Sequence, residues 1–390
     1  MKWKFYSLAF VAGMSILTAC SSDDNNDNDG NGGNGNGNEI ENGTILKGTI
    51  TSDVTLAAGN TYKLSGEYIV EEGATLHIEE GVKIIAVYDD IADYILVKQG
   101  GKINAVGTPD KPIVMTSEKE EPGAWGGIHI CGRAHTNAEG GKGSSEIGGA
   151  VYGGNDDADN SGTLQYIRLE YTGFAFDEEH EANGISFYGV GNGTIVDHCQ
   201  AYKGSDDGFE FFGGSVNVSN LVAVSCSDDS FDWTEGWNGK GTNLVAYQEA
   251  ESTLGYDCDC LMECDNNGSN NAATPVAHPV LKNLILVGNG GSKQGIRLRA
   301  GTEVEIDNAK VCGKGQPLTV ETALTENALK NSTSKLTNIT LTAELSSKEG
   351  IYTHADFIAV TSNKVDANLS YSSFEDIRKE CSWMNGSWVK

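Results

Sequence analysis

From about residue 44 onward, the chain consists of short runs in which apolar and polar residues alternate, separated by Gly, Asn and Asp. A period of two residues is typical of strands that bury one face, and Gly, Asn and Asp favour turns. Very few stretches show the spacing of an amphipathic helix. The pattern predicts a nearly all-β fold, and we expect residues 44–390 to form a single domain.

One motif occurs twice in the middle of the chain. Residues 205–211 read Ser-Asp-Asp-Gly-Phe-Glu-Phe, and residues 227–233 read Ser-Asp-Asp-Ser-Phe-Asp-Trp, which is an offset of 22 residues. The same offset relates Cys199 to Leu221. A repeat of this length indicates a solenoid in which each copy forms one turn, and the dense leucine spacing of leucine-rich repeats is absent. We therefore predict a solenoid of stacked β-strands.

The repeated strand has apolar first and third residues, so these side chains point into a shared interior and the middle side chain points outward. Further copies occur at 185–187 and 296–298, and 262–264 has the same pattern. Because neighbouring strands lie about 4.8 Å apart, the middle residues should form one outer column. Its members are Ser186, Glu210, Asp232, Glu263 and Arg297.

Asparagine followed by an apolar residue is a second marker of the repeat. It occurs at Asn220, Asn243, Asn283, Asn308 and Asn338. Stacked one turn apart, these side chains are expected to hydrogen-bond to each other as a ladder.

Composition supports a turn-rich β architecture and limits the partners. The 390 residues include 50 Gly and 6 Pro, without the three-residue period of collagen. Asp and Glu number 55 against 27 Lys and Arg, which gives a formal charge of −28. A field of this sign repels a phosphate backbone, so we exclude nucleic acid as a partner.

The N-terminal residues indicate export and a membrane anchor. Lys2 and Lys4 precede an apolar stretch that is too short to remain in a bilayer, so residues 1–19 are predicted to be a signal peptide. The sequence Leu-Thr-Ala-Cys ending at Cys20 resembles the lipobox of bacterial lipoproteins. This resemblance implies that Cys20 is acylated and attaches the protein to the outer membrane.

Residues 20–43 are predicted to be a lipidated cysteine followed by a disordered tether. Every residue from Asp23 to Asn38 is Asp, Asn or Gly, which leaves nothing to bury. An acidic segment beside the lipidated cysteine resembles the export signal of surface-exposed lipoproteins in one Gram-negative lineage. We expect display at the cell surface, and the alternative is a linker that faces the periplasm.

Several motifs resemble those of the right-handed parallel β-helix, or pectin-lyase-like, architecture, and more closely those of a poorly characterised group of bacterial β-helix lipoproteins. The motifs are Trp125–Ile128, Gly153–Gly162, Glu181–Gly184, Ser205–Gly214 and Trp383–Trp388. The resemblance covers most of residues 45–312 and implies a right-handed parallel β-helix with long loops between turns. We expect a short C-terminal cap in residues 374–388, over the strand edge that an open end would expose.

The outer column is the main candidate for chemistry, with Glu210, Asp232 and Arg297 as candidate catalytic residues. Stacked carboxylates repel each other unless a cation lies among them. Candidate binding residues are Glu263, the turn residues Asp206, Asp207, Asp228 and Asp229, and the aromatic Trp237. The alternative is a solvated acidic surface that repeats because the turns are duplicates.

Two enzyme classes on this fold offer comparisons. The resemblance to pectate lyases implies calcium held by acidic residues and an arginine that abstracts a sugar proton. In polygalacturonase-type hydrolases, paired aspartates perform general acid and base catalysis. Asp206 and Asp207 match that pair loosely, but the Gly-His-Gly of those hydrolases is absent.

A second candidate calcium site lies in residues 157–162. Asp157, Asp159 and Ser161 supply oxygen at the first, third and fifth places of a calcium loop, and Gly162 occupies the sixth. The twelfth place holds Arg168 instead of Glu, so a merely polar turn is the alternative.

Eight cysteines follow Cys20. Cys258, Cys260 and Cys264 lack a nearby His, so we expect a local disulfide rather than a zinc site. Cys199 aligns with an interior leucine and is expected to be buried.

Together these patterns predict a surface-anchored β-helix that binds extracellular glycan with the help of calcium. One alternative is a lyase or glycoside hydrolase that acts on polysaccharide through the same residues. The other alternative is a structural or adhesive stalk.

Overall fold

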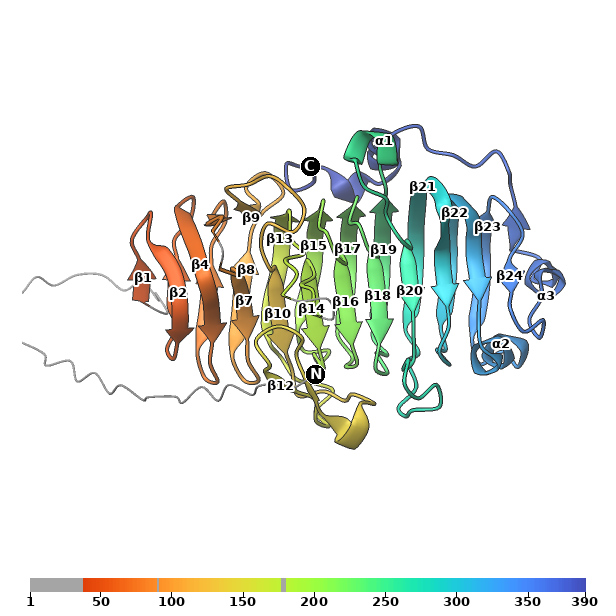
Figure 1. Cartoon of the computed structure of the whole chain (residues 1–390), viewed down its shortest axis with the longest axis horizontal. Coiled ribbons are helices and arrows are strands. Elements are labelled where there is room, and N and C mark those ends of the chain that lie inside the picture. The colour runs from red at the N-terminus through yellow and green to blue at the C-terminus, as the bar shows by residue number, and fades with distance from the viewer. Residues whose placement is uncertain (1–37, 90, 177–179) are drawn as a thin grey trace, which may run out of the picture. The chain divides into compact units, whose positions relative to one another are not determined.

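The computed structural model describes residues 38–390 except residues 90 and 177–179. The predicted signal peptide, Cys20 and residues 21–37 of the predicted tether lie outside the described residues. The strands stack side by side along the long axis of the domain, so that the chain winds as a parallel β-helix (Figure 1). The predicted fold class is confirmed.

Each full turn contributes to three parallel faces, which we name A, B and C. Face A contains the last parts of β2 (Ile45–Ile50) and β4 (Thr61–Val70), then β7 (Tyr94–Val97), β10 (Ile128–Cys131), β14 (Ile185–Tyr188), β16 (Phe209–Phe212), β18 (Phe231–Thr234), β20 (Met262–Cys264), the last parts of β21 (Val280–Leu298) and β22 (Glu305–Val320), and β24 (Ser346–Ser347).

Faces B and C share most of the longer strands. Face B contains β1 (Asn38–Ile40), β3 (Val54–Leu56), β5 (Thr75–Ile78), β8 (Lys102–Val106) and the first parts of β13 (Gly162–Glu170), β15 (Ile195–Tyr202), β17 (Asn217–Val224), β19 (Lys240–Tyr247), β21, β22 and β23 (Lys335–Leu341). Face C contains the first parts of β2 and β4, then β6 (Lys83–Ala86), β9 (Ile113–Ser117), the continuations of the shared strands, and β25 (Lys364–Val365).

The corner between faces B and C explains the spacing of the asparagines. Asn243 has φ 60° and Asn283 has φ 60°, a left-handed conformation that Asn tolerates better than most residues. Asn243 Nδ2 donates to Asn220 Oδ1 at 2.8 Å, and Asn283 Nδ2 donates to Asn243 Oδ1 at 3.0 Å. Asn308 continues this ladder toward the C-terminal end. At the next turn the ladder ends, because Asn338 donates to Asp307 instead.

Apolar side chains stack through the interior of the helix. Cys199, Leu221 and Leu244 occupy paired positions on successive turns and are buried. The ring of Phe209 stacks on that of Phe231 with centroids 5.6 Å apart. The parallel register therefore places similar residues above each other, and the predicted burial of Cys199 is confirmed.

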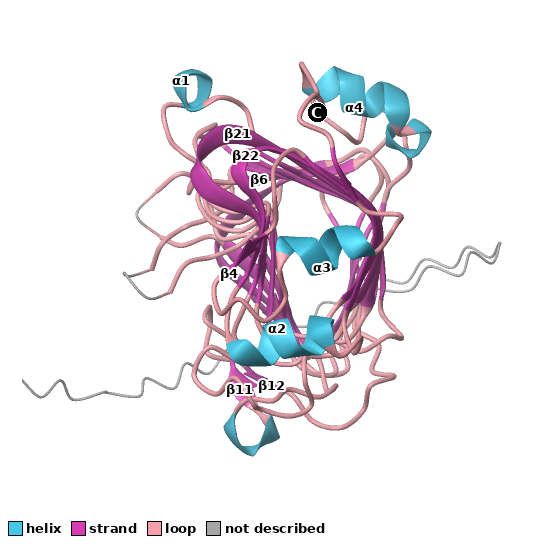
Figure 2. Cartoon of the chain, turned by 90° about the vertical axis from the view of Figure 1, so that its right-hand side faces the viewer, coloured by secondary structure: helices cyan, strands magenta, loops and turns pink. Residues whose placement is uncertain are grey.

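Two short helices cover the C-terminal end of the β-helix. Figure 2, which looks at this end, shows α2 (Ala323–Lys330) and α3 (His354–Ala359) lying across the opening. The predicted cap in residues 374–388 is wrong in its position. Its helices α4 (Phe374–Glu380) and η2 (Ser382–Met384) run back along the outside of face C, because Ile377, Met384 and Trp388 pack on an apolar cluster there.

The remaining elements lie in loops between turns. They are α1 (Glu251–Leu254), η1 (Glu139–Gly141) and an antiparallel pair formed by β11 (Gly143–Ser144) and β12 (Val151–Tyr152). At the N-terminal end, β1 lies within the predicted tether, since residues 38–40 pair with β3 and Ile40 packs against the core. No described helix has the length and apolar composition needed to cross a membrane.

Candidate functional site

The predicted outer column exists on face A. Ser186 pairs with Glu210, Glu210 with Asp232, Asp232 with Glu263, and Glu263 with Arg297. Residues 262–264 are therefore a further copy of the repeat, as expected. The column is less open than predicted, because Ser186 is fully buried and the acidic members are half-buried.

A loop between β10 and β13 covers the N-terminal part of this column. Around its β11–β12 pair, Ile147 and Tyr152 join an outer apolar cluster with Tyr188 and Phe212. The same loop carries Glu146, whose Oε2 accepts a hydrogen bond from the Tyr188 hydroxyl at 3.1 Å. The acidic part of the column therefore begins at the edge of an apolar cover.

The second Asp of the duplicated motif connects successive turns. Asp207 Oδ1 accepts a hydrogen bond from the Asp229 backbone N–H at 2.9 Å, and Asp229 Oδ1 accepts one from Cys260 at 2.6 Å. Asn183 Oδ1 has the same role one turn earlier, where it accepts from the Asp207 N–H at 3.2 Å. Asn183 also donates to Glu210 Oε2 at 2.6 Å. These bonds fix the carboxylates in place and leave each aspartate a second oxygen.

The carboxylates form overlapping groups along face A. In each of three groups the carboxylate oxygens lie within 4.8 Å of one another: Asp206, Asp207 and Asp228; Asp207, Glu210 and Asp232; and Asp229, Asp232 and Glu263. A fourth group joins Asp229 to Asp259 and Cys260. Because Asp207, Asp229 and Asp232 each belong to two groups, the carboxylates form a continuous line, which we call the acidic line.

Burial and mutual repulsion keep protons on this line. Burial, followed by repulsion from Asp228, raises the pKa of Asp206 to about 8. Burial and neighbouring carboxylates also raise the pKa of Asp228 to about 6. Burial is the largest cause for Glu210 and Asp232 as well, whose pKa values lie well above the usual range for carboxyl groups. Ionising the whole line at neutral pH therefore requires a compensating positive charge.

Among the described residues, arginines pair with the carboxylates at the C-terminal end of the acidic line. Arg297 contacts Glu263 at 2.8 Å and Glu321 at 3.3 Å. Arg299 contacts Glu263 at 2.7 Å and Asp265 at 2.7 Å. Burial disfavours the charge of Arg297, but its two carboxylate partners outweigh burial and raise its pKa. Both guanidinium groups are therefore held in ion pairs.

The donor set fits a hard divalent cation. Asp232 Oδ1 is buried and has no hydrogen-bond partner among the described residues, which is costly for a carboxylate oxygen. The two groups that contain Asp232 supply only carboxylate oxygen, the ligand that calcium prefers. Asp207, Glu210, Asp229, Asp232 and Glu263 are the residues that would hold it.

A family model described as a pectate-lyase-like beta helix domain matches residues 48–389, which is most of the chain. The chain belongs to this family. Comparisons with curated proteins and with solved structures gave no match. The predicted resemblance is confirmed, and membership of the pectate-lyase-like β-helix family supports a role connected with polysaccharides or a structural role.

The residues of the second predicted calcium site, in 157–162, contact other protein side chains rather than converging on one point. Asp157 Oδ1 contacts His135 Nδ1 at 2.6 Å, and Ser161 Oγ donates to Asp159 Oδ2 at 3.2 Å. Among the residues that the structure describes, Asp157 and Asp159 do not belong to any of the carboxylate groups close enough to share a metal ion. The calcium loop stays a prediction without support from this geometry.

The predicted binding role of Trp237 is wrong, because the residue is buried in the core. Its side chain is 1% exposed and stacks on Phe211 with ring centroids 4.2 Å apart. The indole N–H donates to the Val216 carbonyl oxygen at 3.1 Å. An aromatic residue just after a repeated strand therefore turns into the core of the β-helix, where a glycan cannot reach it.

The expected local disulfide is also wrong. Cys258, Cys260 and Cys264 are free thiols, as are the other cysteines that the structure describes. Cys264 occupies the inward third position of a repeated strand, which directs its sulfur into the core. The alternation of the repeated strand, rather than a disulfide, therefore sets the direction of the Cys264 side chain.

Three residues of the site were missed by the sequence analysis. Asn183 lies in one of the motifs that carry the family resemblance, and its spacing to Asp207 was a usable signal. Arg299 lies just beyond the end of β21, two positions after Arg297, where continued alternation of side chains directs it outward. Glu146 comes from an inter-turn loop, so no periodicity of the sequence places it.

Proposed function

We propose that the protein is a lipid-anchored β-helix that binds extracellular polysaccharide at the acidic line, with calcium between protein and glycan. The proposal places the acylated Cys20 in the outer membrane and the β-helix at the cell surface. The observation that carries it is the continuous acidic line, in which Asp232 Oδ1 is buried without a partner. Family membership agrees with a polysaccharide ligand.

Electrostatics favours a glycan that reaches the site through a cation. The protein carries a formal charge of −28, so an acidic sugar would be repelled from bare carboxylates. A bound calcium ion reverses the local sign and accepts carboxylate or hydroxyl oxygens in its open coordination positions. The same residues thus explain why ligand binding would depend on the ion.

The state of Arg297 favours binding over a lyase reaction. An arginine that abstracts a proton must lose its own proton, and the partners Glu263 and Glu321 hold the guanidinium charged. Arg297 is therefore assigned to positioning Glu263 at the end of the acidic line rather than to proton abstraction.

A hydrolase is the second candidate, because one observation favours it. A general acid must keep its proton near neutral pH, and burial raises the pKa of Asp228 to about 6. Glu263, a half-buried member of the outer column, would supply the second carboxyl group. A stalk without a ligand is the third candidate.

The experiment is a glycan array probed with the full-length protein in calcium and in chelator, followed by titration of each ligand found. The test variant is Glu210→Gln combined with Asp232→Asn, and the matched control is Asp307→Asn on the outside of face B. We expect saturable binding in calcium that is lost with chelator and in the test variant, but kept in the control.

Product release from the same polysaccharides separates binding from catalysis. Turnover that disappears in the double variant would replace the binding proposal by the hydrolase. If the protein shows no binding and no turnover in calcium, the stalk without a ligand is the remaining candidate.

A further inference from the structure

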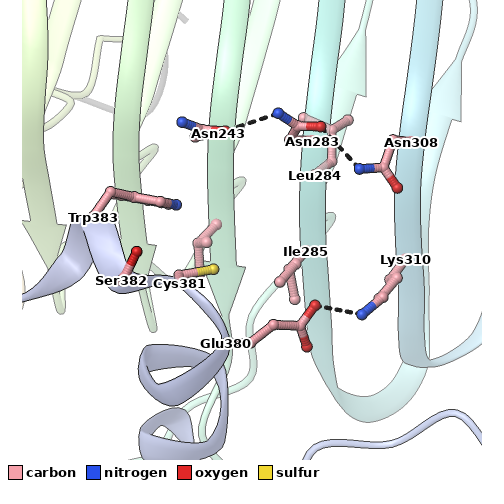
Figure 3. Close-up of a pocket in the computed structure, with 11 residues that line it drawn as sticks. Asn243, Asn283, Leu284, Ile285, Asn308, Lys310, Glu380, Cys381, Ser382 and Trp383 are labelled. Atoms are coloured by element: carbon pink, nitrogen blue, oxygen red, sulfur yellow. Dashed lines mark hydrogen bonds and ion pairs between the residues drawn. The ribbon is translucent and has the colours of Figure 1, made fainter.

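A cavity lies on the outside of face C beside the B–C corner, between the asparagine ladder and the C-terminal segment. Its volume is about 270 Å³, slightly below the range of about 300–1,000 Å³ typical of drug-sized ligands. Figure 3 shows Asn243, Asn283 and Asn308 in a row along one side, with Trp383 and the Lys310–Glu380 pair on the others. The size suits one ring with polar substituents.

The ladder offers hydrogen bonds that it does not use itself. Asn283 donates to Asn243 at 3.0 Å and accepts from Asn308 at 2.8 Å. A primary amide has two N–H groups and an oxygen with two lone pairs, so the ladder leaves one donor and one acceptor site on Asn283. The amides repeat at the strand spacing of about 4.8 Å, which is similar to the separation of alternate equatorial hydroxyls on a pyranose ring.

The other walls supply an apolar surface without net charge. Trp383 is half-buried and its indole nitrogen points toward the cavity, while Ile285 lies between the amides and the ion pair (Figure 3). Lys310 and Glu380 neutralise each other in an ion pair. An aromatic ring beside amides recognises a molecule that has both C–H faces and hydroxyl groups.

We infer that this cavity binds a single neutral pyranose unit, with its hydroxyls on the amides of Asn283 and Asn308 and one C–H face against Trp383. The site is separate from the acidic line and needs no cation, so it goes beyond the proposed function. Charged sugars are disfavoured because the cavity has no unpaired charge to receive them.

The test is saturation-transfer NMR of the full-length protein in chelator, with the methyl pyranosides of glucose, galactose, mannose and N-acetylglucosamine, and with the methyl glycoside of galacturonic acid, whose carboxylate is free, as the charged probe. We expect at least one neutral sugar to bind, with Kd on the order of millimolar, and the uronate to bind more weakly. Asn283→Gly should weaken binding about tenfold or more, and Trp383→Ala should do the same.

Asn338→Gly is the matched control, because Asn338 shares the left-handed conformation but lies outside the cavity. It should leave binding unchanged, as should Asp232→Asn in the acidic line. Absence of saturable binding by all four neutral sugars would overturn the inference. So would binding that survives Asn283→Gly and Trp383→Ala, or a preference for the uronate. Loss of glycan binding at the acidic line alone would leave these results unaffected.

Discussion

Asp232 pairs directly with Glu210 in the parallel ladder of face A, although 22 residues separate them in the chain. Their outward side chains share one group of carboxylate oxygens with Asp207. Two neighbouring turns thus place like charges together at a half-buried surface, where repulsion is weakly screened. Stability of the β-helix is therefore linked to what neutralises these groups.

Asp232→Asn should stabilise the protein in chelator, by about 1–3 kcal/mol, because the raised pKa of the buried, unpartnered carboxyl group makes it costly either to ionise or to protonate at neutral pH, and the amide avoids this cost. In wild type, calcium should raise the melting temperature, and the variant should lose most of this gain. Thermal unfolding followed by circular dichroism, with and without calcium, measures both effects. A variant that is less stable than wild type in chelator would contradict the interpretation of Asp232.

Asp307→Asn provides the control, because the pKa of Asp307 is lowered in the folded state whereas that of Asp232 is raised. Asp307 accepts hydrogen bonds from Thr337 Oγ1 at 3.0 Å and Asn338 Nδ2 at 2.6 Å. These bonds lower its pKa, so its charge is favourable in the folded state. Neutralising Asp307 should give no stabilisation in chelator and no change in the response to calcium.

Stability should also depend on pH in a defined direction. Burial raises the folded-state pKa of Asp228 to about 6, of Glu146 to about 7 and of Asp206 to about 8. Between about pH 4 and pH 8 the folded state therefore binds more protons than the unfolded state, and stability falls as pH rises. Urea unfolding in chelator should give a midpoint that decreases from pH 5 to pH 8.

Calcium should flatten this dependence, because the ion replaces the protons. A midpoint in chelator that stays constant or increases from pH 5 to pH 8 would show that these carboxylates are ionised without cost in the folded state. The double variant Glu210→Gln and Asp232→Asn should have a weaker dependence than wild type, which locates the effect on the acidic line.

The column itself was predictable because each copy of the repeated strand has apolar first and third residues, whatever the length of the loop before it. The offset between Ser205 and Ser227 was enough to place Glu210 beside Asp232. Alternation then assigned the inward and outward side chains. The asparagine ladder followed from the same regularity, although its end at Asn338 did not.

The parts that could not be predicted depend on segments that leave the repeat. Glu146 reaches the site from a loop whose path is set by the packing of Ile147 and Tyr152. Trp237 comes after a repeated strand, and only its packing on Phe211 shows that it turns inward. The segment around Trp388 was assigned to the open end, whereas an apolar patch on the outside of face C attracts it.

The packing of α2 and α3 over the C-terminal end of the β-helix depends on a buried carboxylate in α2. Glu326 has no exposed surface and accepts hydrogen bonds from Ser347 Oγ at 2.8 Å and from the backbone N–H of Ile351 at 2.6 Å and Tyr352 at 3.0 Å. Glu326→Ala should cost about 3 kcal/mol, because it leaves these donors without an acceptor. Hydrogen exchange should increase first in residues 345–352. Glu344→Ala, at an exposed position in the same segment, should change neither measurement.

Glu326 should also affect how the free energy of unfolding changes at acid pH. Burial alone would raise its pKa, but the hydrogen bonds outweigh burial and lower it. Its contribution is therefore present above the unfolded pKa and is lost as pH falls through the folded value. Below about pH 4, wild type should lose stability more steeply than Glu326→Ala. Parallel curves for the two proteins would mean that the carboxylate is not ionised in the fold.

Substitutions in the ladder separate its hydrogen bonds from the conformation of the corner. Asn243 has φ 60° and bonds to Asn220 and Asn283. Asn243→Gly keeps the left-handed conformation and removes both bonds, which should cost about 1–2 kcal/mol. Asn243→Ala removes the same bonds and adds about 1 kcal/mol of backbone strain. Urea unfolding should therefore rank wild type above Gly and Gly above Ala. Equal stability of wild type and Asn243→Gly would mean that the asparagines are selected for the turn alone and that their ladder contributes no net stability.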